Sequence, residues 1–142
     1  MPELDARTEA GVSLASEMLG EKFGERIREH ITSGAFAADI ARHGMTHSYT
    51  DCWSRPGLGR RERSLTTIGV LIGLKQPAEL KNHIRIGVAN GLTVKEIEEV
   101  LIQASTYVGY PAIASATSAV VEVLRELGLA PDAQTSEERG VL

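Results

Sequence analysis

A chain of 142 residues is long enough for one domain with a single hydrophobic core, and no second domain is expected. Its formal net charge of −4 argues against a nucleic-acid or membrane partner, because both need an excess of Lys and Arg to meet phosphates. The single cysteine, Cys52, excludes an intrachain disulfide and a Cys-x-x-Cys redox pair. No secretory signal pattern and no membrane-length apolar run are present, so we expect a cytoplasmic protein.

Helix signals dominate the chain, and we expect an all-α fold. An amphipathic segment covers residues 8–19 and ends at Gly20, and a second covers residues 21–31. Residues 36–51 have poor helical periodicity. Residues 54–59 are rich in Pro and Gly and are expected to form a loop.

The middle of the chain predicts two further helices. Residues 60–74 are apolar on most sides after a charged first turn, which is typical of a central buried helix. Gly69 and Gly73 lie one turn apart there, a spacing that lets another helix approach closely. The next helix begins at Pro77 and ends at Gly91, because Pro suits the first helical turn and Gly suits the position after the last.

Two more helices complete the expected bundle. A Thr-x-x-Glu capping box at Thr93 predicts a helix that runs to Tyr107. The last helix opens at Pro111 and ends at a Gly and a Pro. The polar residues 131–142 are expected to be disordered. Residues 1–130 are therefore predicted to form one compact bundle of six or seven helices.

One helix of this bundle carries a polar stripe that points to function. At 100° per residue, Leu80 and Ile84 lie on an apolar stripe, and Glu79, His83 and Asn90 lie on a polar stripe beside it. A polar stripe along the edge of a core stripe is typical of a pocket wall. A histidine on a helix face is also often a hydrogen-bonded structural residue, and that alternative stays open.

An arginine cluster lies around the start of the predicted helix over residues 60–74. Four arginines fall within nine residues: Arg55, Arg60, Arg61 and Arg63. In an acidic chain such a cluster could receive an anionic substrate. It could equally be a solvated helix start or a site of salt bridges between subunits.

Three segments carry a resemblance to a known family. They read WSRPGLGRRERSLTTIGVLIGL, ELKNHIRIGVANGLTVKEI and YVGYP, and they lie within the stretch from Trp53 to Leu124, about half of the chain. With them the chain resembles the carboxymuconolactone decarboxylase family, which shares its helical fold with alkylhydroperoxidase D. The resemblance implies an all-α, alkylhydroperoxidase D-like protomer. It also implies a homo-oligomer, a trimer or a hexamer, with the pocket near a subunit interface.

The peroxidase branch of this fold has a Cys-x-x-Cys pair, a histidine four residues after the second cysteine, and a glutamate nineteen residues before that histidine. His83 matches the histidine, but Gln76 and Glu79 stand at the cysteine positions and Ser64 stands at the glutamate position. A disulfide-relay peroxidase needs an attacking thiolate and a resolving thiol, so we do not expect that activity. Cys52 is expected to be a small buried residue.

The decarboxylase branch fits better, with two departures. It has a Trp-Gly-Glu element where this chain has Tyr49, Thr50 and Asp51, and an asparagine where this chain has Ala114. The resemblance implies decarboxylation of a 4-carboxymuconolactone-like butenolide acid to an oxoadipate enol-lactone, in aromatic-acid catabolism by the β-ketoadipate pathway. An enzyme of secondary metabolism acting on a different lactone or cyclic acid, and a non-catalytic oligomeric binding module, stay open as alternatives.

The implied reaction sets three tasks: to hold two carboxylates, to stabilise an oxyanion, and to return a proton to carbon. Loss of CO2 leaves electrons conjugated to the lactone carbonyl, so the small-molecule substrate carries its own electron sink and we expect no cofactor. His43 and His47 lie four residues apart and could bind zinc on a helix. Because no third ligand is evident, we expect no metal.

Each task has candidate residues. Arg60, Arg63 and Arg85 could pair with carboxylates through the planar guanidinium, although Arg85 points about 160° away from His83 on its helix. His83 could act as general acid or oxyanion donor. Glu79 could hold the imidazole and raise its pKa, or it could be a plain surface charge.

Four more residues complete the candidate site. Asp51 could assist proton transfer if it replaces the acid of the family element. Trp53, Tyr107 and Tyr110 could form pocket walls, yet aromatic residues beside turns are as often core anchors.

Overall fold

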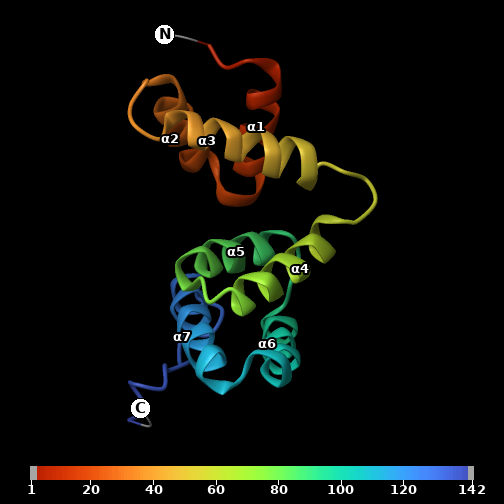
Figure 1. The fold of residues 1–142 in the computed structure, drawn as a ribbon. Helices are drawn as coiled ribbons and strands as arrows, with labels where there is room; N and C mark the ends of the chain where they lie inside the picture. Colours follow the sequence, from red (N-terminus) through yellow and green to blue (C-terminus); the bar gives the residue numbers. More distant parts are fainter. Residues whose placement is uncertain (1–2, 141–142) are drawn as a thin grey trace. The chain divides into compact units, whose positions relative to one another are not determined.

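The computed structural model describes residues 3–140, and within this range all regular secondary structure is helical. This confirms the all-α fold class predicted by the sequence. Figure 1 shows the helices in chain order. The elements are α1 (Ala6–Leu19), α2 (Glu21–Thr32), α3 (Ala38–Gly44), the π-helix η1 (Met45–Trp53), α4 (Arg60–Gly73), α5 (Pro77–Ala89), α6 (Val94–Val108) and α7 (Tyr110–Glu126).

These helices divide into two compact units, a first unit that ends at Arg60 and a second unit that begins at Arg61. Each is described by itself. The single domain predicted over residues 1–130 therefore stays a prediction. No helix within residues 3–140 is long and apolar enough to cross a membrane.

In the first unit, α1 packs closely against η1. Gly11 of α1 is buried, and a Cβ at this position would clash with the backbone carbonyl oxygen of Met45. The Thr50 hydroxyl donates to the backbone oxygen of Arg7 at 2.7 Å, and the Arg7 guanidinium donates to both oxygens of Asp51 at 2.8 and 3.0 Å. A glycine at the contact and a polar link across it therefore fix η1 against α1.

The segment with poor helical periodicity is helical after all, because α3 continues directly into η1. A π-helix bonds residue i to residue i+5, as the Ser54 amide does to the Tyr49 oxygen at 3.1 Å. Its buried residues, Met45, Tyr49 and Trp53, are spaced every four positions. The same spacing also suits an α-helix, so the pattern of buried residues alone does not distinguish the two helix types.

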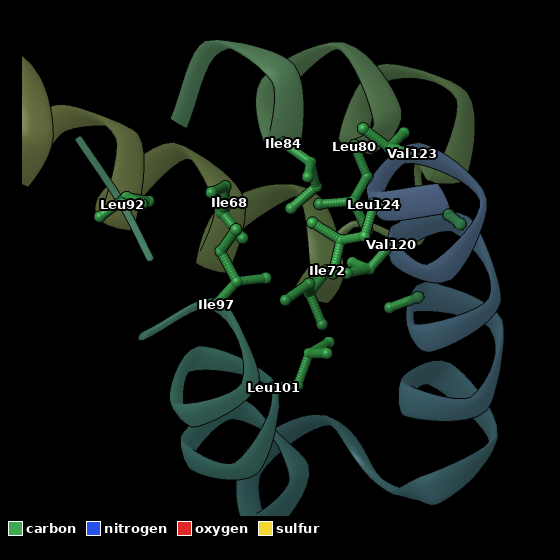
Figure 2. Close-up of a cluster of buried hydrophobic side chains, with 12 residues drawn as sticks. Ile68, Ile72, Leu80, Ile84, Leu92, Ile97, Leu101, Val120, Val123 and Leu124 are labelled. Carbon is green, nitrogen blue, oxygen red and sulfur yellow. The ribbon is translucent and has the colours of Figure 1, made fainter. Parts of the chain in front are cut away.

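The second unit is built around a core of branched aliphatic side chains from α4, α5, α6 and α7, which point toward one another in Figure 2. Its members with no more than 1 % of their surface exposed are Ile68, Ile72, Leu80, Ile84, Ile97 and Val123. Truncation of such a residue to Ala typically costs about 2–5 kcal/mol of stability.

Helix α4 contributes only one stripe to this core. Its buried residues are Ser64, Ile68 and Ile72, whereas Val70 and Leu74 are 52 % and 62 % exposed. The prediction of a central buried helix over residues 60–74 is therefore wrong. The apolar residues on its other sides are not covered by the other helices of the second unit.

The helix ends predicted from the sequence agree with the structure to within one residue at α6 and α7, and Gly91 follows α5. The Thr93 hydroxyl accepts from the Glu96 amide at 3.1 Å, and the Glu96 carboxylate accepts from the Thr93 amide at 3.1 Å, which confirms the predicted capping box of α6. Gly91, with φ of 96°, follows α5 as predicted. Helix α7 begins at Tyr110, one residue before the predicted Pro111.

Ion pairs on the surface join α5 to α7. Lys81 pairs with Glu122, and Arg85 pairs with Glu126 at 2.7 Å. Each partner lies four residues after its counterpart on the same helix, so the two helices run in parallel. Lys81 and Arg85 thus lie on the side of α5 that faces α7.

The sequence predicted residues 131–142 to be disordered. In the structure residues 131–140 form turns, Thr135 is buried, and Arg125 of α7 donates two hydrogen bonds to Glu138 at 2.6 and 2.8 Å. These contacts attach the segment to the second unit. Residues 141 and 142 lie outside the described residues.

Candidate active site

The polar stripe of α5 runs beside the core, as predicted. His83 is half-buried in the middle of the helix. Burial lowers the pKa of His83, and the Glu79 carboxylate one turn earlier raises it by a smaller amount, so the pKa ends below its ordinary value of 6.5. The imidazole is therefore mainly neutral at neutral pH. The predicted influence of Glu79 has the expected sign, but burial outweighs it.

Glu79 itself is exposed in the first turn of α5. Its carboxylate accepts a long hydrogen bond of 3.5 Å from the Asn82 amide. Its effect on the pKa of His83 is the attraction between its negative charge and the imidazolium. Glu79 thus acts on the histidine electrostatically, which suits an exposed carboxylate one helical turn away.

A polar contact joins the end of this stripe to α4. The Asn90 side-chain amide donates to the Ser64 hydroxyl at 3.0 Å, and Ser64 is fully buried. Ser64 is the only polar member of the buried stripe of α4. The sequence predicts Asn90 on the polar stripe but gives it no role, and Ser64 is noted there only as the residue at the glutamate position of the peroxidase branch.

Of the three candidate arginines, Arg63 shares the second unit with His83 and sits next to Ser64 in the first turn of α4. Its side chain is half-buried. Arg85 donates to Glu126 at 2.7 Å and to Asn82 at 3.2 Å. The structure therefore places Arg85 on the α7 side of α5, as the predicted angle from His83 requires, and engages it in an ion pair.

The remaining arginine, Arg60, and the candidate acid Asp51 belong to the first unit. Arg60 donates to Glu17 of α1 at 2.7 Å. Asp51 accepts from Arg7 and lies 3.5 Å from Nδ1 of His47. Each of these side chains thus makes an ion pair within its own unit, and their roles at the site stay predictions.

Trp53 is buried in the first unit. Its ring stacks on Tyr49, with centroids 6.3 Å apart and planes at 18°. These two aromatic residues and Met45 form the buried side of η1. The alternative that Trp53 is a core anchor therefore has structural support, and its role as a pocket wall stays a prediction.

The two tyrosines flank Gly109, the residue between α6 and α7. Tyr107 is 82 % exposed and borders a groove of about 680 Å³ between α4 and α6. Tyr110 is 75 % exposed and borders a groove of about 480 Å³ between α6 and α7. His83 lines neither groove, so the structure does not bring either tyrosine into a pocket with it.

The other polar candidates of the first unit lie along η1 and the end of α3. The rings of His43 and His47 stack with centroids 5.8 Å apart. Across residues 3–140, no group of three or more His, Cys, Asp or Glu side chains is placed to hold a metal ion. Cys52 is exposed, so the prediction that it is buried is wrong. The buried side of η1 is taken by Tyr49 and Trp53 instead.

Comparison with known proteins adds to this geometry. The model of the carboxymuconolactone decarboxylase family matches residues 38–122. The chain is 37 % identical over 128 residues to a 4-carboxymuconolactone decarboxylase of Acinetobacter baylyi. The aligned region covers 90 % of this chain and 94 % of that relative. It is 30 % identical over 117 residues to a nitrosuccinic acid decarboxylase of Metarhizium robertsii, and that aligned region covers 82 % of this chain and 80 % of the relative.

Both relatives are named as decarboxylases, and the matched region includes α4, α5 and the stripe with His83. The chain is accordingly an enzyme of the carboxy-lyase class. It belongs to the carboxymuconolactone decarboxylase family.

Proposed function

We propose that the protein decarboxylates a 4-carboxymuconolactone-like butenolide acid and yields an oxoadipate enol-lactone, within aromatic-acid catabolism. The observation that carries this proposal is a half-buried histidine of lowered pKa on a polar stripe of α5, whose end at Asn90 bonds to Ser64, the residue after Arg63. The 37 % identity to a 4-carboxymuconolactone decarboxylase supports the choice of substrate. Action in the cytoplasm and assembly into a trimer or a hexamer stay predictions.

The chemistry assigns a task to each residue. The bond between the ring carbon and its carboxylate breaks, and its electron pair moves through the ring double bond to the lactone carbonyl oxygen. A neutral His83 donates its N–H to that oxygen as negative charge develops, which stabilises the transition state more than the substrate. The proton then returns to the carbon next to the carbonyl. The negative charge on the enolate raises the proton affinity of the imidazole beside it, so His83 takes a proton from solvent and passes it to that carbon.

The second carboxylate of the substrate is not lost and must be held. Arg63 is the candidate for this task, because a guanidinium can bind a carboxylate through two parallel hydrogen bonds. Glu79 sets the balance between the two forms of His83 through its charge. With these three residues, binding, oxyanion stabilisation and proton return are all supplied by the second unit.

The relative named as a nitrosuccinic acid decarboxylase supports a second candidate substrate. Nitrosuccinic acid also carries two carboxylates, and its nitro group can accept the electron pair that CO2 leaves behind. The shared requirement is thus a dicarboxylic acid with an oxygen-terminated electron sink. A donor such as His83 and a guanidinium such as Arg63 suit either acid.

The test is to incubate the purified protein with 4-carboxymuconolactone and, separately, with nitrosuccinic acid, and to measure CO2 release. Turnover of the lactone supports the proposal, and turnover of nitrosuccinic acid alone selects the second candidate. Binding of either acid by calorimetry, with no CO2 from either, would contradict both. That result would favour the non-catalytic binding module.

A further inference from the structure

We infer that Ser64 and Asn90 form a positioning pair that holds the first turn of α4, with Arg63, in register with the half of α5 that carries His83. The inference rests on the roles proposed above for Arg63 and His83. Neither Ser64 nor Asn90 is required to touch the substrate. Their effect on the reaction would come through the two residues that they hold in place.

The contact has the features of a fixed polar link inside the hairpin. Ser64 is 0 % exposed and its hydroxyl lies 3.0 Å from the Asn90 amide nitrogen. The other buried residues of α4, Ile68 and Ile72, follow at intervals of four and make the apolar part of the same stripe. A buried hydroxyl that loses its partner retains an unmet desolvation penalty, so this hydrogen bond strongly favours one register.

Close packing one turn away makes the hairpin sensitive to that register. A Cβ on Gly87 of α5 would lie 3.2 Å from the side chain of Ile68 and 3.0 Å from that of Leu92. In the same α4 turn, Arg61 pairs with Glu96 of α6. The first turn of α4 is thus fixed by a half-exposed ion pair to α6 and by the buried Ser64–Asn90 bond to the end of α5.

The link lies close to both candidate residues in the chain. Arg63 directly precedes Ser64, and His83 lies seven residues before Asn90, two turns along the same face of α5 and about 10 Å away. A shift of the α4 turn would change the distance between the guanidinium and the imidazole. Displacements of about 1 Å can lower turnover by about 100-fold, so a small change in register is enough.

The test compares Ser64→Ala, Asn90→Ala and the double variant with the unmodified protein. Thr66→Ala serves as a matched control, because Thr66 is an exposed residue of α4 whose hydroxyl bonds only to the Glu62 backbone oxygen of its own helix. For each protein, kcat/KM is measured with the acid that is turned over, at a temperature well below Tm. The pKa of His83 is measured by NMR titration of its imidazole, assigned with a His83→Gln variant.

We expect both single variants and the double variant to lose kcat/KM by the same factor, about tenfold or more, because the pair acts as a unit. The pKa of His83 should rise toward its ordinary value by equal amounts in all three, since a loosened hairpin admits water. Asn90→Asp should recover most of the loss, because its carboxylate can accept from the Ser64 hydroxyl. The control should match the unmodified protein.

Three results would overturn the inference. One is a lower Tm in all three variants with unchanged kcat/KM and an unchanged His83 titration, which would make the pair purely structural. Another is a loss in Asn90→Ala with normal Ser64→Ala, which would mean that Asn90 acts on the substrate itself. If the unmodified protein turns over neither acid, the proposed function fails, and an unchanged His83 titration in the variants would then refute the pair separately.

Discussion

Replacement of His83 by Ala is the most direct test of the site. The side chain is half-buried, so its loss removes about 1–2 kcal/mol of packing. Domains of this size are stable by about 5–15 kcal/mol, so about 99 % of the variant stays folded even at the lower limit. If His83 stabilises the oxyanion or delivers the proton, kcat should instead fall by about 10²–10⁴-fold, a barrier increase of about 3–5 kcal/mol. Unfolding cannot account for a loss of that size.

The assay measures kcat, KM and Tm on one preparation of each variant. His83→Gln keeps an N–H donor and should lose less turnover than His83→Ala. His30→Ala, which removes a histidine from the first unit, is the matched control and should keep the kcat of the unmodified protein. A normal kcat for His83→Ala together with a lower Tm would refute the catalytic assignment and leave His83 as a structural residue.

Further predictions concern pH, packing, the thiol and the ion pairs. Because burial holds the pKa of His83 below 6.5, the unfolded chain binds a proton there that the folded chain does not, so stability should fall as pH drops from 6.5 through the lowered pKa. Urea unfolding at several pH values should show this trend in the unmodified protein and a weaker one in His83→Gln. Gly11→Ala should cost about 3 kcal/mol or more in the same assay, since its Cβ meets the Met45 carbonyl; a near-normal midpoint would refute this. Cys52→Ala should keep turnover within about tenfold of the unmodified protein, and a larger loss with the fold preserved would reveal a reactive thiol. Arg85→Ala should lower stability by about 0–1 kcal/mol and leave KM unchanged, whereas a large rise in KM would restore it as a substrate ligand.

Features set by neighbours in the chain could be predicted from the sequence. The capping box at Thr93 needs only residues three positions apart, and the stripe with His83 needs only helical spacing. The π-helix was not predicted, because its buried residues recur every four positions, a spacing that an α-helix also allows. The exposure of Val70 was not predicted either, because an apolar helix face does not show in the sequence whether other helices of the chain will cover it.

The candidate site shows the same division. The position of His83 at the edge of the core followed from the sequence, but the direction of its pKa did not, because that depends on how deeply tertiary packing buries the ring. The contact between Ser64 and Asn90 joins residues on two helices and has no local signature. Likewise, the engagement of Arg85 by Glu126 becomes visible only when α5 and α7 lie side by side.

The core of the second unit has a consequence for folding kinetics. Its buried aliphatic residues all lie between Ile68 and Leu124, on helices that follow one another along the chain (Figure 2). Contacts of such short sequence separation need little loop closure, and helical proteins of low contact order fold in microseconds to milliseconds. We therefore expect stopped-flow refolding to contain a fast phase that Ile84→Ala slows or abolishes, whereas Val12→Ala, in the first unit, leaves that phase unchanged.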